Sequence, residues 1–427
     1  MAIQMDILDK GKQYLSPVMG HYTDLEVISA KGVWVTTVQG RSYLDFTSGV
    51  AVTNTGHNHP AVVQAIKDQA DQLIHISSGV AYCKPNVDLA EKLVQKTGYA
   101  DGSVFFCQSG TEAIEASIKL VRYVTKKPKL LTYTLAFHGR TLGALSMTYK
   151  EKFRQGYENW LIKDVERLPY PYCYRCPYAK TYGDCGFECL KALKSLLLAD
   201  DQIGGVLIEP ILGEGGYVPA PIEYIQELRR FTSERGIALI FDEIQSGFGR
   251  TGMMFAKELY DVQPDVMALA KGIASGMPLG ACVARGDLMK QWTTSAHGGT
   301  FLGNTLSCAA GLATLRVIEA EKLLDNAYQV GQFIKGLLEE AKQRHPVMGD
   351  IRGAGLMIGI EFVKAGTLTP NPELVTTLRR VAQERGLLLL SCGEEGQVIR
   401  LIPPLMITKE EAAQGINIIL DIIREQT

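Results

Sequence analysis

Continuous apolar runs dominate the middle of the chain. Residues 204–211 (GGVLIEPI), 237–242 (IALIFD) and 265–270 (DVMALA) contain few polar positions, which is typical of strands that are buried on both faces. A helical pattern lies between the first two runs, over residues 222–235, and ends at Gly236. Strand, helix and strand in succession predict a largely parallel sheet with helices on both faces.

The N-terminal part of the chain has a different pattern. Residues 33–46 (VWVTTVQGRSYLDF) alternate apolar and polar positions on both sides of Gln39-Gly40. Alternation with a period of two around a glycine turn predicts a β-hairpin.

The C-terminal part has a third pattern. Two apolar runs, 356–363 and 398–402, bracket a helix candidate at 373–385. A last helix is expected after Thr408, because Thr408 and Glu411 have the spacing of a capping box. These elements predict a smaller α/β domain. We divide the chain into an N-terminal segment (1–55) that packs with the small domain, a large cofactor-binding domain (56–315) and a C-terminal small domain (316–427).

Composition and charge narrow the class of protein. The 427 residues are 46% hydrophobic and 21% charged, with a formal net charge of -2, as in ordinary globular proteins of two or three domains. No basic stripe indicates nucleic-acid binding, and no stretch approaches the roughly 18 apolar residues that cross a membrane. The first residues lack the apolar core of a signal peptide. We expect a cytoplasmic protein that binds neither nucleic acid nor membrane.

Four of the nine cysteines lie in one loop. Their spacing, C-x2-C-x8-C-x3-C, is typical of ligands for a structural zinc ion. Reduced thiols and one local disulfide are the other interpretations, and the pattern does not choose among the three. An odd total without a secretion signal argues against a disulfide framework for the whole chain. The four are Cys173, Cys176, Cys185 and Cys189.

A candidate phosphate site follows the strand-like run 104–107. Ser109, Gly110 and Thr111 open a helix there, and a strand–glycine turn–helix junction presents free backbone N–H groups together with the positive end of the helix dipole. The two hydroxyl groups would add donors. A plain helix N-cap is the alternative, and it is favoured when the segment is taken alone.

Two further candidates stand at the ends of apolar runs. Asp242 ends the run 237–242, and Glu243 follows it. We expect that these two acids cannot both be core residues, so one should face the crevice at the carboxyl ends of the strands. An N-cap or a surface pair is the alternative. Lys271 follows the run 265–270. A desolvated lysine amine loses its proton readily and can form an imine, whereas a strand-end lysine alone more often reaches out to solvent.

Together these three features meet the needs of pyridoxal phosphate. The helix start anchors the phosphate, an aspartate keeps the pyridine nitrogen protonated, and the lysine captures the aldehyde. No G-x-G-x-x-G follows the first strand of the central sheet, and no Walker G-x-x-x-x-G-K-[ST] is present. The pattern therefore favours a pyridoxal-phosphate enzyme over a nicotinamide or nucleoside-triphosphate enzyme.

Longer motifs point to a family. They are FHGRT (137–141), EPILGEGG (209–216), FDEIQSGFGRTG (241–252), ALAKGI (268–273) and GGTFLGN (298–304). With them the chain resembles the class III (subgroup II) aminotransferases of pyridoxal-phosphate fold type I, and it is similar to the 4-aminobutyrate, ornithine and acetylornithine aminotransferases over nearly its whole length. The resemblance implies an α/β fold: a large domain with a mostly parallel seven-stranded sheet flanked by helices, plus a small α/β domain.

The resemblance implies roles around the cofactor. Lys271 forms the imine and then moves a proton, Asp242 pairs with the pyridinium nitrogen, and Phe137 stacks on the ring; these three are the expected catalytic residues. Thr300 would reach the phosphate in the neighbouring subunit, which makes the active unit a homodimer. The other cofactor-binding residues expected on this basis are Ser109, Gly110, Thr111, His138, Glu209 and Gln245.

The resemblance also implies a substrate site. Arg400 matches the arginine that takes the α-carboxylate of glutamate or 2-oxoglutarate, and Glu214 matches the acid that pairs with it when an ω-amino donor is bound. Arg140 matches the arginine that holds the distal carboxylate, and Val50 would line the same pocket. Structural ion pairing is the alternative for the three charged residues.

We therefore expect transamination from an ω-amino acid or amine of the 4-aminobutyrate type to 2-oxoglutarate, giving glutamate. The alternative is a relative on the same scaffold: an amino-acid racemase, an aminomutase, a decarboxylase, an acetylornithine or ornithine aminotransferase, or a β-amino acyl aminotransferase. All of these keep the lysine and the aspartate, so the motifs hardly separate them.

Overall fold

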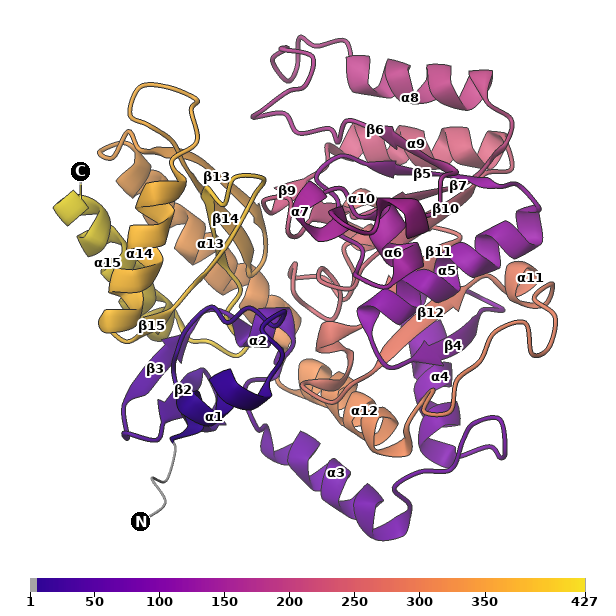
Figure 1. Cartoon of the computed structure of the whole chain (residues 1–427), viewed down its shortest axis with the longest axis horizontal. Helices are drawn as coiled ribbons and strands as arrows, with labels where there is room; N and C mark the ends of the chain where they lie inside the picture. Colours follow the sequence, from indigo (N-terminus) through magenta and orange to yellow (C-terminus); the bar gives the residue numbers. More distant parts are fainter. Residues whose placement is uncertain (1–5, 427) are drawn as a thin grey trace.

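The computed structural model describes residues 6–426. Two parts lie side by side: a larger part built on a central sheet, and a smaller part that contains the C-terminal helix (Figure 1). Residues 1–5, in the predicted N-terminal segment, and residue 427, in the predicted small domain, lie outside the described residues. No helix within 6–426 combines the length and hydropathy needed to cross a membrane.

A seven-stranded sheet forms the centre of the larger part, in the order β4-β12-β11-β10-β7-β5-β6. Only β12 within this sheet runs against its neighbours; the other strands share one direction. The predicted mostly parallel sheet is confirmed. Its strands are β4 (Ser103–Cys107), β5 (Lys129–Tyr133), β6 (Val165–Leu168), β7 (Ile203–Ile208), β10 (Ala238–Asp242), β11 (Val266–Leu269) and β12 (Gly280–Ala284).

Helices cover both faces of this sheet, which explains the unbroken apolar runs. Helix α5 (Gly110–Thr125) packs on one face, where it shares a buried cluster with Leu207 and Ile240. Helices α8 (Glu188–Ala199) and α9 (Ile222–Glu234) belong to the cluster on the other face, with Leu239 and Phe241. Neighbouring strand residues thus point to opposite faces, and both are dry.

The smaller part is an antiparallel sheet with helices packed against it. Its strands are in the order β13-β14-β17-β16. The final helix, α15, begins with the predicted capping box: Thr408 N donates to Glu411 Oε2 at 3.0 Å, and Glu411 N donates to Thr408 Oγ1 at 3.1 Å. The elements are β13 (Met348–Ala354), β14 (Met357–Phe362), β16 (Leu390–Cys392), β17 (Val398–Leu401), α13 (Leu323–Lys342), α14 (Pro372–Glu384) and α15 (Lys409–Gln426).

The predicted N-terminal hairpin is also confirmed. Strands β2 (Trp34–Thr37) and β3 (Ser42–Asp45) pair antiparallel, and β1 (Val27–Lys31) extends them. On the other side of β3 lies β15 (Leu387–Leu388), which pairs parallel to it, so strands from opposite ends of the chain share one sheet. The three-part division of the chain stays a prediction; α12 (Thr305–Ala320) runs through its second boundary.

Shorter elements complete the fold. They are α1 (Ile7–Tyr14), α2 (Ser48–Ala51), α3 (Pro60–Gln72), α4 (Lys84–Thr97), α6 (Leu142–Met147), α7 (Glu151–Arg154), η1 (Glu158–Trp160), β8 (Ile211–Leu212), β9 (Val218–Pro219), α10 (Lys257–Tyr260), η2 (Lys271–Ala274) and α11 (Gly286–Met289).

Candidate active site

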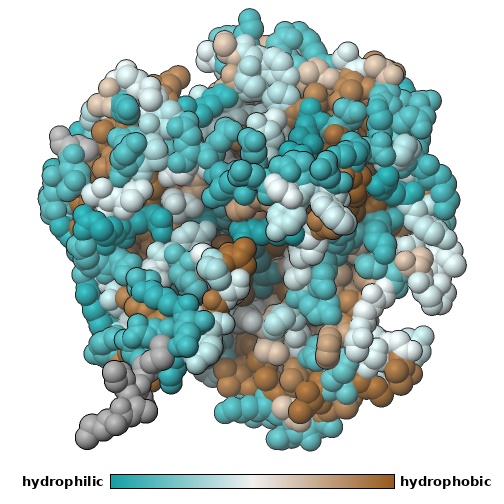
Figure 2. Space-filling view, in the orientation of Figure 1, coloured by the Kyte–Doolittle hydropathy of each residue, from teal (hydrophilic) through white to brown (hydrophobic). Residues whose placement is uncertain are grey.

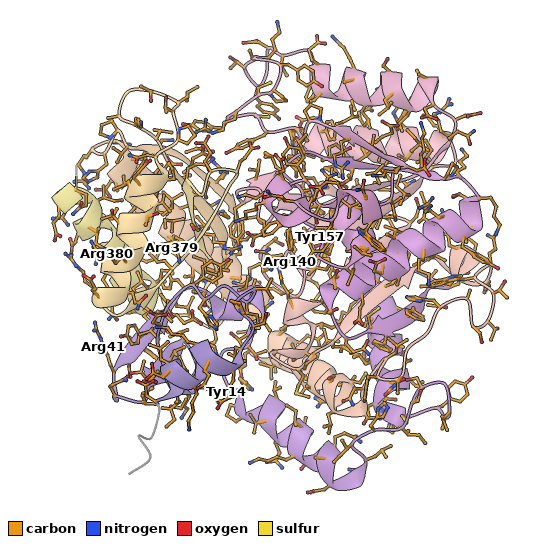
Figure 3. The ribbon with its side chains drawn as sticks, viewed as in Figure 1. Tyr14, Arg41, Arg140, Tyr157, Arg379 and Arg380 are labelled. Atoms are coloured by element: carbon orange, nitrogen blue, oxygen red, sulfur yellow. The ribbon has the colours of Figure 1, made fainter. Side chains whose placement is uncertain are left out.

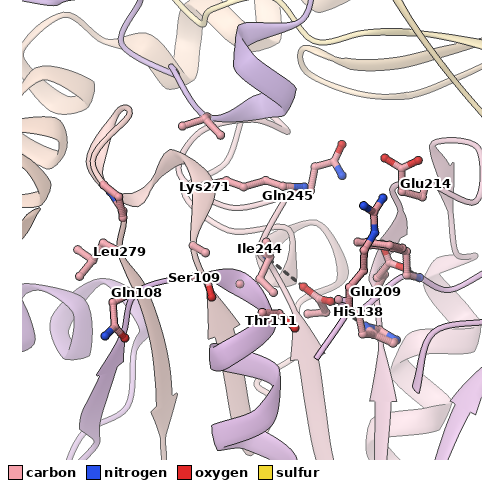
Figure 4. Close-up of a pocket in the computed structure, with 18 of the residues that line it drawn as sticks. Gln108, Ser109, Thr111, His138, Glu209, Glu214, Ile244, Gln245, Lys271 and Leu279 are labelled. Carbon is pink, nitrogen blue, oxygen red and sulfur yellow. Dashed lines mark hydrogen bonds and ion pairs between the residues drawn. The ribbon is translucent and has the colours of Figure 1, made fainter. Parts of the chain in front are cut away.

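A cavity of about 500 Å³ lies at one edge of the central sheet (Figure 4). Strands β4, β5, β7, β10 and β11 run in one direction, so their carboxyl ends meet at this edge, where open α/β sheets bind ligands. The cavity has the size of a small-molecule site. The predicted site residues that line it are Ser109, Gly110, Thr111, Phe137, His138, Arg140, Glu209, Glu214, Asp242, Gln245 and Lys271.

The start of α5 forms an anion cradle at this edge. The N–H groups of Gly110 and Thr111 have no hydrogen-bond partner within residues 6–426, as expected for the first turn of a helix. A Cβ at Gly110 would lie 2.9 Å from Ile244 Cγ2, so only glycine fits there. The side chain of Ser109 is an N-cap, because its Oγ accepts from Glu112 N and donates to Glu112 Oε2.

Asp242 ends β10 with its carboxylate held on both sides. Asp242 Oδ2 accepts from His138 Nδ1 at 2.7 Å, and Oδ1 accepts from Ile244 N at 3.0 Å. Thr132 Oγ1 lies 3.3 Å from His138 Nε2, which places the imidazole in a chain of buried polar groups. Such support fixes the direction of a buried carboxylate.

The expectation that Asp242 and Glu243 cannot both be core residues is wrong. Glu243 is completely buried and does not line the cavity. Its carboxylate accepts from the N–H groups of Ala256 (2.9 Å) and Lys257 (2.7 Å) and from the hydroxyl of Ser246. Three donors make this burial tolerable. Burial still raises the pKa of Glu243 to about 7.

Lys271 follows β11 and extends into the cavity (Figure 4). Its backbone has a φ of +48°, a left-handed conformation that costs a non-glycine residue about 1–3 kcal/mol. Burial lowers the pKa of its amine, and the nearby Glu214 opposes that effect. The amine has no hydrogen bond or ion pair within the described part of the chain. A strained, desolvated and unpartnered lysine is poised to act as a nucleophile.

Two other predicted cofactor residues turn out to hold the cavity wall. Glu209 accepts from Phe137 N at 3.0 Å and from Gly213 N at 2.9 Å, and burial raises its pKa to about 7. Gln245 accepts from the hydroxyl of the buried Tyr217. Glu209 and Gln245 therefore help to position the segments that carry Phe137 and Glu214, and their contact with the cofactor stays a prediction.

The aromatic wall continues to the mouth of the cavity. Phe137 packs edge-on against Phe153, with ring centroids 5.4 Å apart, and the guanidinium of Arg140 lies 4.5 Å from the Phe153 ring centroid. Figure 3 shows Arg140 near the middle of the molecule, where the two parts face each other. Arg140 is exposed and has no carboxylate partner among residues 6–426, so its charge is available to a ligand.

An ion pair closes the side of the cavity that faces the smaller part. Glu214 comes from the loop after β8, and Arg400 comes from β17. Burial raises the pKa of Glu214, but the Arg400 guanidinium outweighs it, so the carboxyl stays below its usual pKa. Arg400 itself is fully buried behind Glu214, and its Nε and one terminal nitrogen, Nη2, have no hydrogen-bond partner.

Val50 does not reach the cavity, and Thr300, which is predicted for the neighbouring subunit's site, lies outside it. Residues 48–51 form a left-handed turn, which directs Val50 toward the buried cluster that contains Tyr217; Val52 lines the cavity instead. Thr300 is exposed beside a separate hollow with Phe105. Local patterns could not have found Val52 or the other unpredicted lining residues, which are Gln108, Gly139, Ile244, Ala270, Gly276, Met277, Pro278 and Leu279.

The four-cysteine loop lies outside this site. It connects β6 to α8, and its free thiols line a separate cavity of about 20 Å³. Burial raises the pKa of Cys173 to about 11, which keeps that thiol protonated at neutral pH. No three acidic, cysteine or histidine side chains within 6–426 are placed to hold one metal ion. At the start of the loop, Tyr172 and Arg175 bind the buried carboxylate of Glu361 in β14.

The fold and the cavity together define a cofactor-dependent α/β enzyme, since they bring an anion cradle, an oriented acid and a buried free amine to one sheet edge. Comparison with known families says which kind. Residues 16–423 match the family model described as Aminotransferase class-III. The chain belongs to this family, and it is a pyridoxal-phosphate-dependent aminotransferase.

Individual relatives cover most of the chain. It is 37% identical to an alanine/serine racemase of Pyrococcus horikoshii over 407 residues (92% of this chain, 84% of the relative). It is 35% identical to a probable 4-aminobutyrate aminotransferase of Bacillus subtilis over 419 residues (96% and 95%). A solved Bacillus anthracis aminotransferase matches with a TM-score of 0.92 at 29% identity, over 98% of both chains.

The residues present fit pyridoxal phosphate. The N–H groups of Gly110 and Thr111 are unpaired within residues 6–426 and can bind an anion. The Asp242 carboxylate lines the cavity, where it can accept from a ring nitrogen, and the Lys271 amine has no partner within residues 6–426. When bound, the cofactor supplies an aldehyde that takes the amino group and a ring that withdraws electrons.

Proposed function

We propose that this protein transfers an amino group from an ω-amino donor of the 4-aminobutyrate type to 2-oxoglutarate. The observation that carries the proposal is the pair of Glu214 and Arg400 at the inner end of the cavity. One site must accept a donor with only a hydrocarbon stem near the cofactor and an acceptor with a carboxylate there. Glu214 can neutralise the buried Arg400 while the donor is bound and can move away when the carboxylate of the acceptor binds, so one site can accept both substrates.

The unpaired nitrogens of Arg400 support this proposal. A buried N–H group without an acceptor costs about 1–3 kcal/mol, and Arg400 has such groups on Nε and Nη2. A substrate carboxylate that displaced Glu214 would bind the planar fork through two donors. For an ω-amino donor, Glu214 stays in place and leaves no bare charge beside the stem.

The roles of the other site residues follow from their positions. Lys271 would hold the cofactor and carry the proton to and from the substrate carbon. Asp242, oriented by His138, would keep the ring nitrogen protonated. Phe137 would stack on the ring, and the start of α5 would bind the phosphate. The exposed and unpaired Arg140 would hold the distal carboxylate of 2-oxoglutarate.

We also propose that the working unit is a homodimer in which Thr300 serves the partner's site. Large apolar side chains are exposed in two loops: Tyr82 is 97% exposed, and Phe301, next to Thr300 in the chain, is 57% exposed. The ring of His75 contacts Phe301, so the 73–82 loop and the Thr300 loop form one surface. Figure 2 shows hydrophobic residues gathered at the lower edge of the larger part. Such a patch favours a protein partner, and the proposal assigns a second copy of this chain as that partner, with Thr300 facing its cavity.

Racemisation is the second candidate function, because an alanine/serine racemase is 37% identical to this chain. The two functions differ in the fate of the amino group: a transaminase leaves it on the cofactor after the first half-reaction, whereas a racemase returns it to the same substrate. In the test, the purified enzyme is mixed with single donors (4-aminobutyrate, 5-aminovalerate, ornithine, alanine and glutamate), and conversion of the cofactor to its amine form is followed by absorbance. 2-Oxoglutarate is then added, and glutamate is measured.

The proposal expects an ω-amino donor to convert the cofactor and 2-oxoglutarate to restore it. Loss of optical activity from L-alanine or L-serine without any oxo-acid would favour the racemase instead. Failure of every ω-amino donor, with rapid conversion by α-amino acids alone, would overturn the ω-donor assignment.

A further inference from the structure

A second, smaller cavity lies next to the main one. Its volume is about 10 Å³, about the space of one water molecule. Phe137 and Glu214 line both cavities. Lys150 and Gly393 line only the small one, so Glu214 stands between the main cavity and the Lys150 side.

Lys150 is held close to Glu214 by one glycine. Lys150 Nζ donates to Gly393 O at 2.9 Å, and Gly393 N donates to the backbone oxygen of Glu214, also at 2.9 Å. Lys150 is therefore connected, through Gly393, to the backbone segment that carries Glu214. The contact spans the two parts of the molecule, because Gly393 follows β16 and Lys150 follows α6.

The charge of Lys150 is not compensated in this arrangement. No carboxylate within residues 6–426 forms an ion pair with it, and a backbone carbonyl is the acceptor it has. The side chain is half-buried, which lowers its pKa, and Lys152 lowers it further; Glu214 and Glu394 act in the opposite direction. A half-buried ammonium without a counter-ion is a ready partner for a mobile carboxylate.

Glu214 needs such a partner when it leaves Arg400. Its side chain is 26% exposed, so a carboxylate moved off the guanidinium would still be largely out of water. An unpaired charge in such a place is costly, and the cost would oppose binding of the substrate carboxylate. A cation on the far side of Glu214 removes that cost.

We propose that Lys150 receives the Glu214 carboxylate when a substrate α-carboxylate binds Arg400. Lys150 is then a positioning residue that sets the balance between ω-amino donors and α-carboxylate substrates. The proposal rests on the proposed function, because it requires Glu214 to alternate between two states. While Glu214 is paired with Arg400, Lys150 has no carboxylate partner. When a substrate carboxylate binds Arg400, Glu214 pairs with Lys150, and all four charges have partners.

Lys150→Met tests this, because methionine keeps the apolar stem and removes the charge. The matched control is Lys152→Met, two residues away and exposed. We expect Lys150→Met to slow the half-reaction with glutamate about tenfold or more, and to leave the half-reaction with 4-aminobutyrate within about twofold of wild type. We expect Lys152→Met to leave the rates of both half-reactions close to wild type. Calorimetric binding of glutarate, which has two carboxylates and no reacting carbonyl, should weaken similarly in Lys150→Met alone.

A Glu214→Gln background separates action through the gate from direct contact with substrate. If Lys150 acts through Glu214, adding Lys150→Met to Glu214→Gln changes glutamate rate and glutarate binding little further. An undiminished loss in the double variant would mean that Lys150 contacts the substrate itself, and the proposal would be overturned. An unchanged ratio of the two half-reactions in Lys150→Met would also overturn it. Wild-type enzyme that runs neither ω-donor nor 2-oxoglutarate half-reaction would instead refute the proposed function.

Discussion

The imidazole of His138 donates to the carboxylate of Asp242 across 2.7 Å, and both side chains are buried. The second oxygen of the carboxylate accepts from Ile244 N, so neither oxygen is free to turn. His138 reaches this position from the loop after β5, whereas Asp242 ends β10. The acid at the centre of the site is therefore held by a residue from a different strand connection, as supporting residues often hold a catalytic group.

Asp242→Asn should cut the half-reaction rate by several orders of magnitude, because a neutral amide cannot keep the ring nitrogen protonated. Single-turnover absorbance changes with the best donor measure this. His138→Gln serves as the comparison, since it removes the support and leaves the acid; a loss of about 10–100-fold is expected. A near-normal rate for Asp242→Asn would contradict the role given to the acid.

Lys271→Ala should abolish turnover while the protein still folds and binds pyridoxal phosphate without a covalent bond. The reason is that Lys271 is the unpartnered amine that extends into the cavity. Borohydride reduction followed by peptide mapping checks the attachment in the wild type. Lys271→Arg is the matched control, because it keeps a positive charge but cannot bond to the aldehyde. Labelling of another lysine would refute the assignment.

Glu214→Ala should shift preference toward α-amino donors such as glutamate, because Arg400 is then always exposed to the substrate. Arg400→Ala should mainly weaken 2-oxoglutarate. Removing one partner of such a buried pair changes discrimination by about 2–5 kcal/mol. The measurement is the ratio of the rates with an ω-amino donor and with glutamate. An unaltered ratio in Glu214→Ala would end the gating hypothesis and strengthen the racemase alternative.

The free energy of unfolding should fall as pH rises from 6 to 8, in part because of Glu243. Its pKa is about 7 in the folded protein against an ordinary value of 4.5, so the folded state binds more protons between these values and loses stability as they dissociate. The contribution of Glu243 over this range is about 1 kcal/mol. Denaturation of holoenzyme at both pH values should show a smaller fall in Glu243→Gln, whereas Glu339→Gln, which changes an exposed acid in α13, should behave as wild type. Equal falls in all three proteins would contradict this.

Hybrid dimers test whether Thr300 acts across the subunit boundary. Subunits with Lys271→Ala and subunits with Thr300→Val should each be impaired as homodimers. The two variants are co-expressed with different affinity tags, so that hybrid dimers can be purified. Each hybrid should have about half of the wild-type activity, because one of its two sites combines an intact Lys271 with an intact Thr300 from the other chain. If Thr300 served its own chain, the hybrid would keep only the activity of the Thr300→Val site.

Local patterns were sufficient for the framework of the site. The runs that became β10 and β11 are apolar throughout because helices cover both faces of the sheet, and each ends at a residue of the cavity, Asp242 or Lys271. In a parallel sheet all carboxyl ends meet at one edge. Placing residues at strand ends was therefore enough to predict that Asp242, Lys271 and Gly110 come together.

The same patterns could not decide what each polar group contacts. The sequence places Asp242 and Glu243 side by side, but only packing turns one to the cavity and buries the other under three donors. Glu209 lines the cavity as predicted, but no sequence pattern shows that its two oxygens accept from the N–H groups of Phe137 and Gly213. Val50 lies outside the cavity because its backbone is left-handed, and no periodicity encodes that conformation.

Sequence alone thus determined the class of fold, the strand-end lysine and aspartate, and, through its motifs, the family. The tertiary structure decided the contacts around these residues. They are the pairing of His138 with Asp242, the unpaired nitrogens of Arg400 behind Glu214, and the placement of Lys150 beside Glu214. The physical reason is distance along the chain. Period and turn signals report on neighbours within one element, whereas Glu214 and Arg400 are 186 residues apart and meet only when two sheets pack.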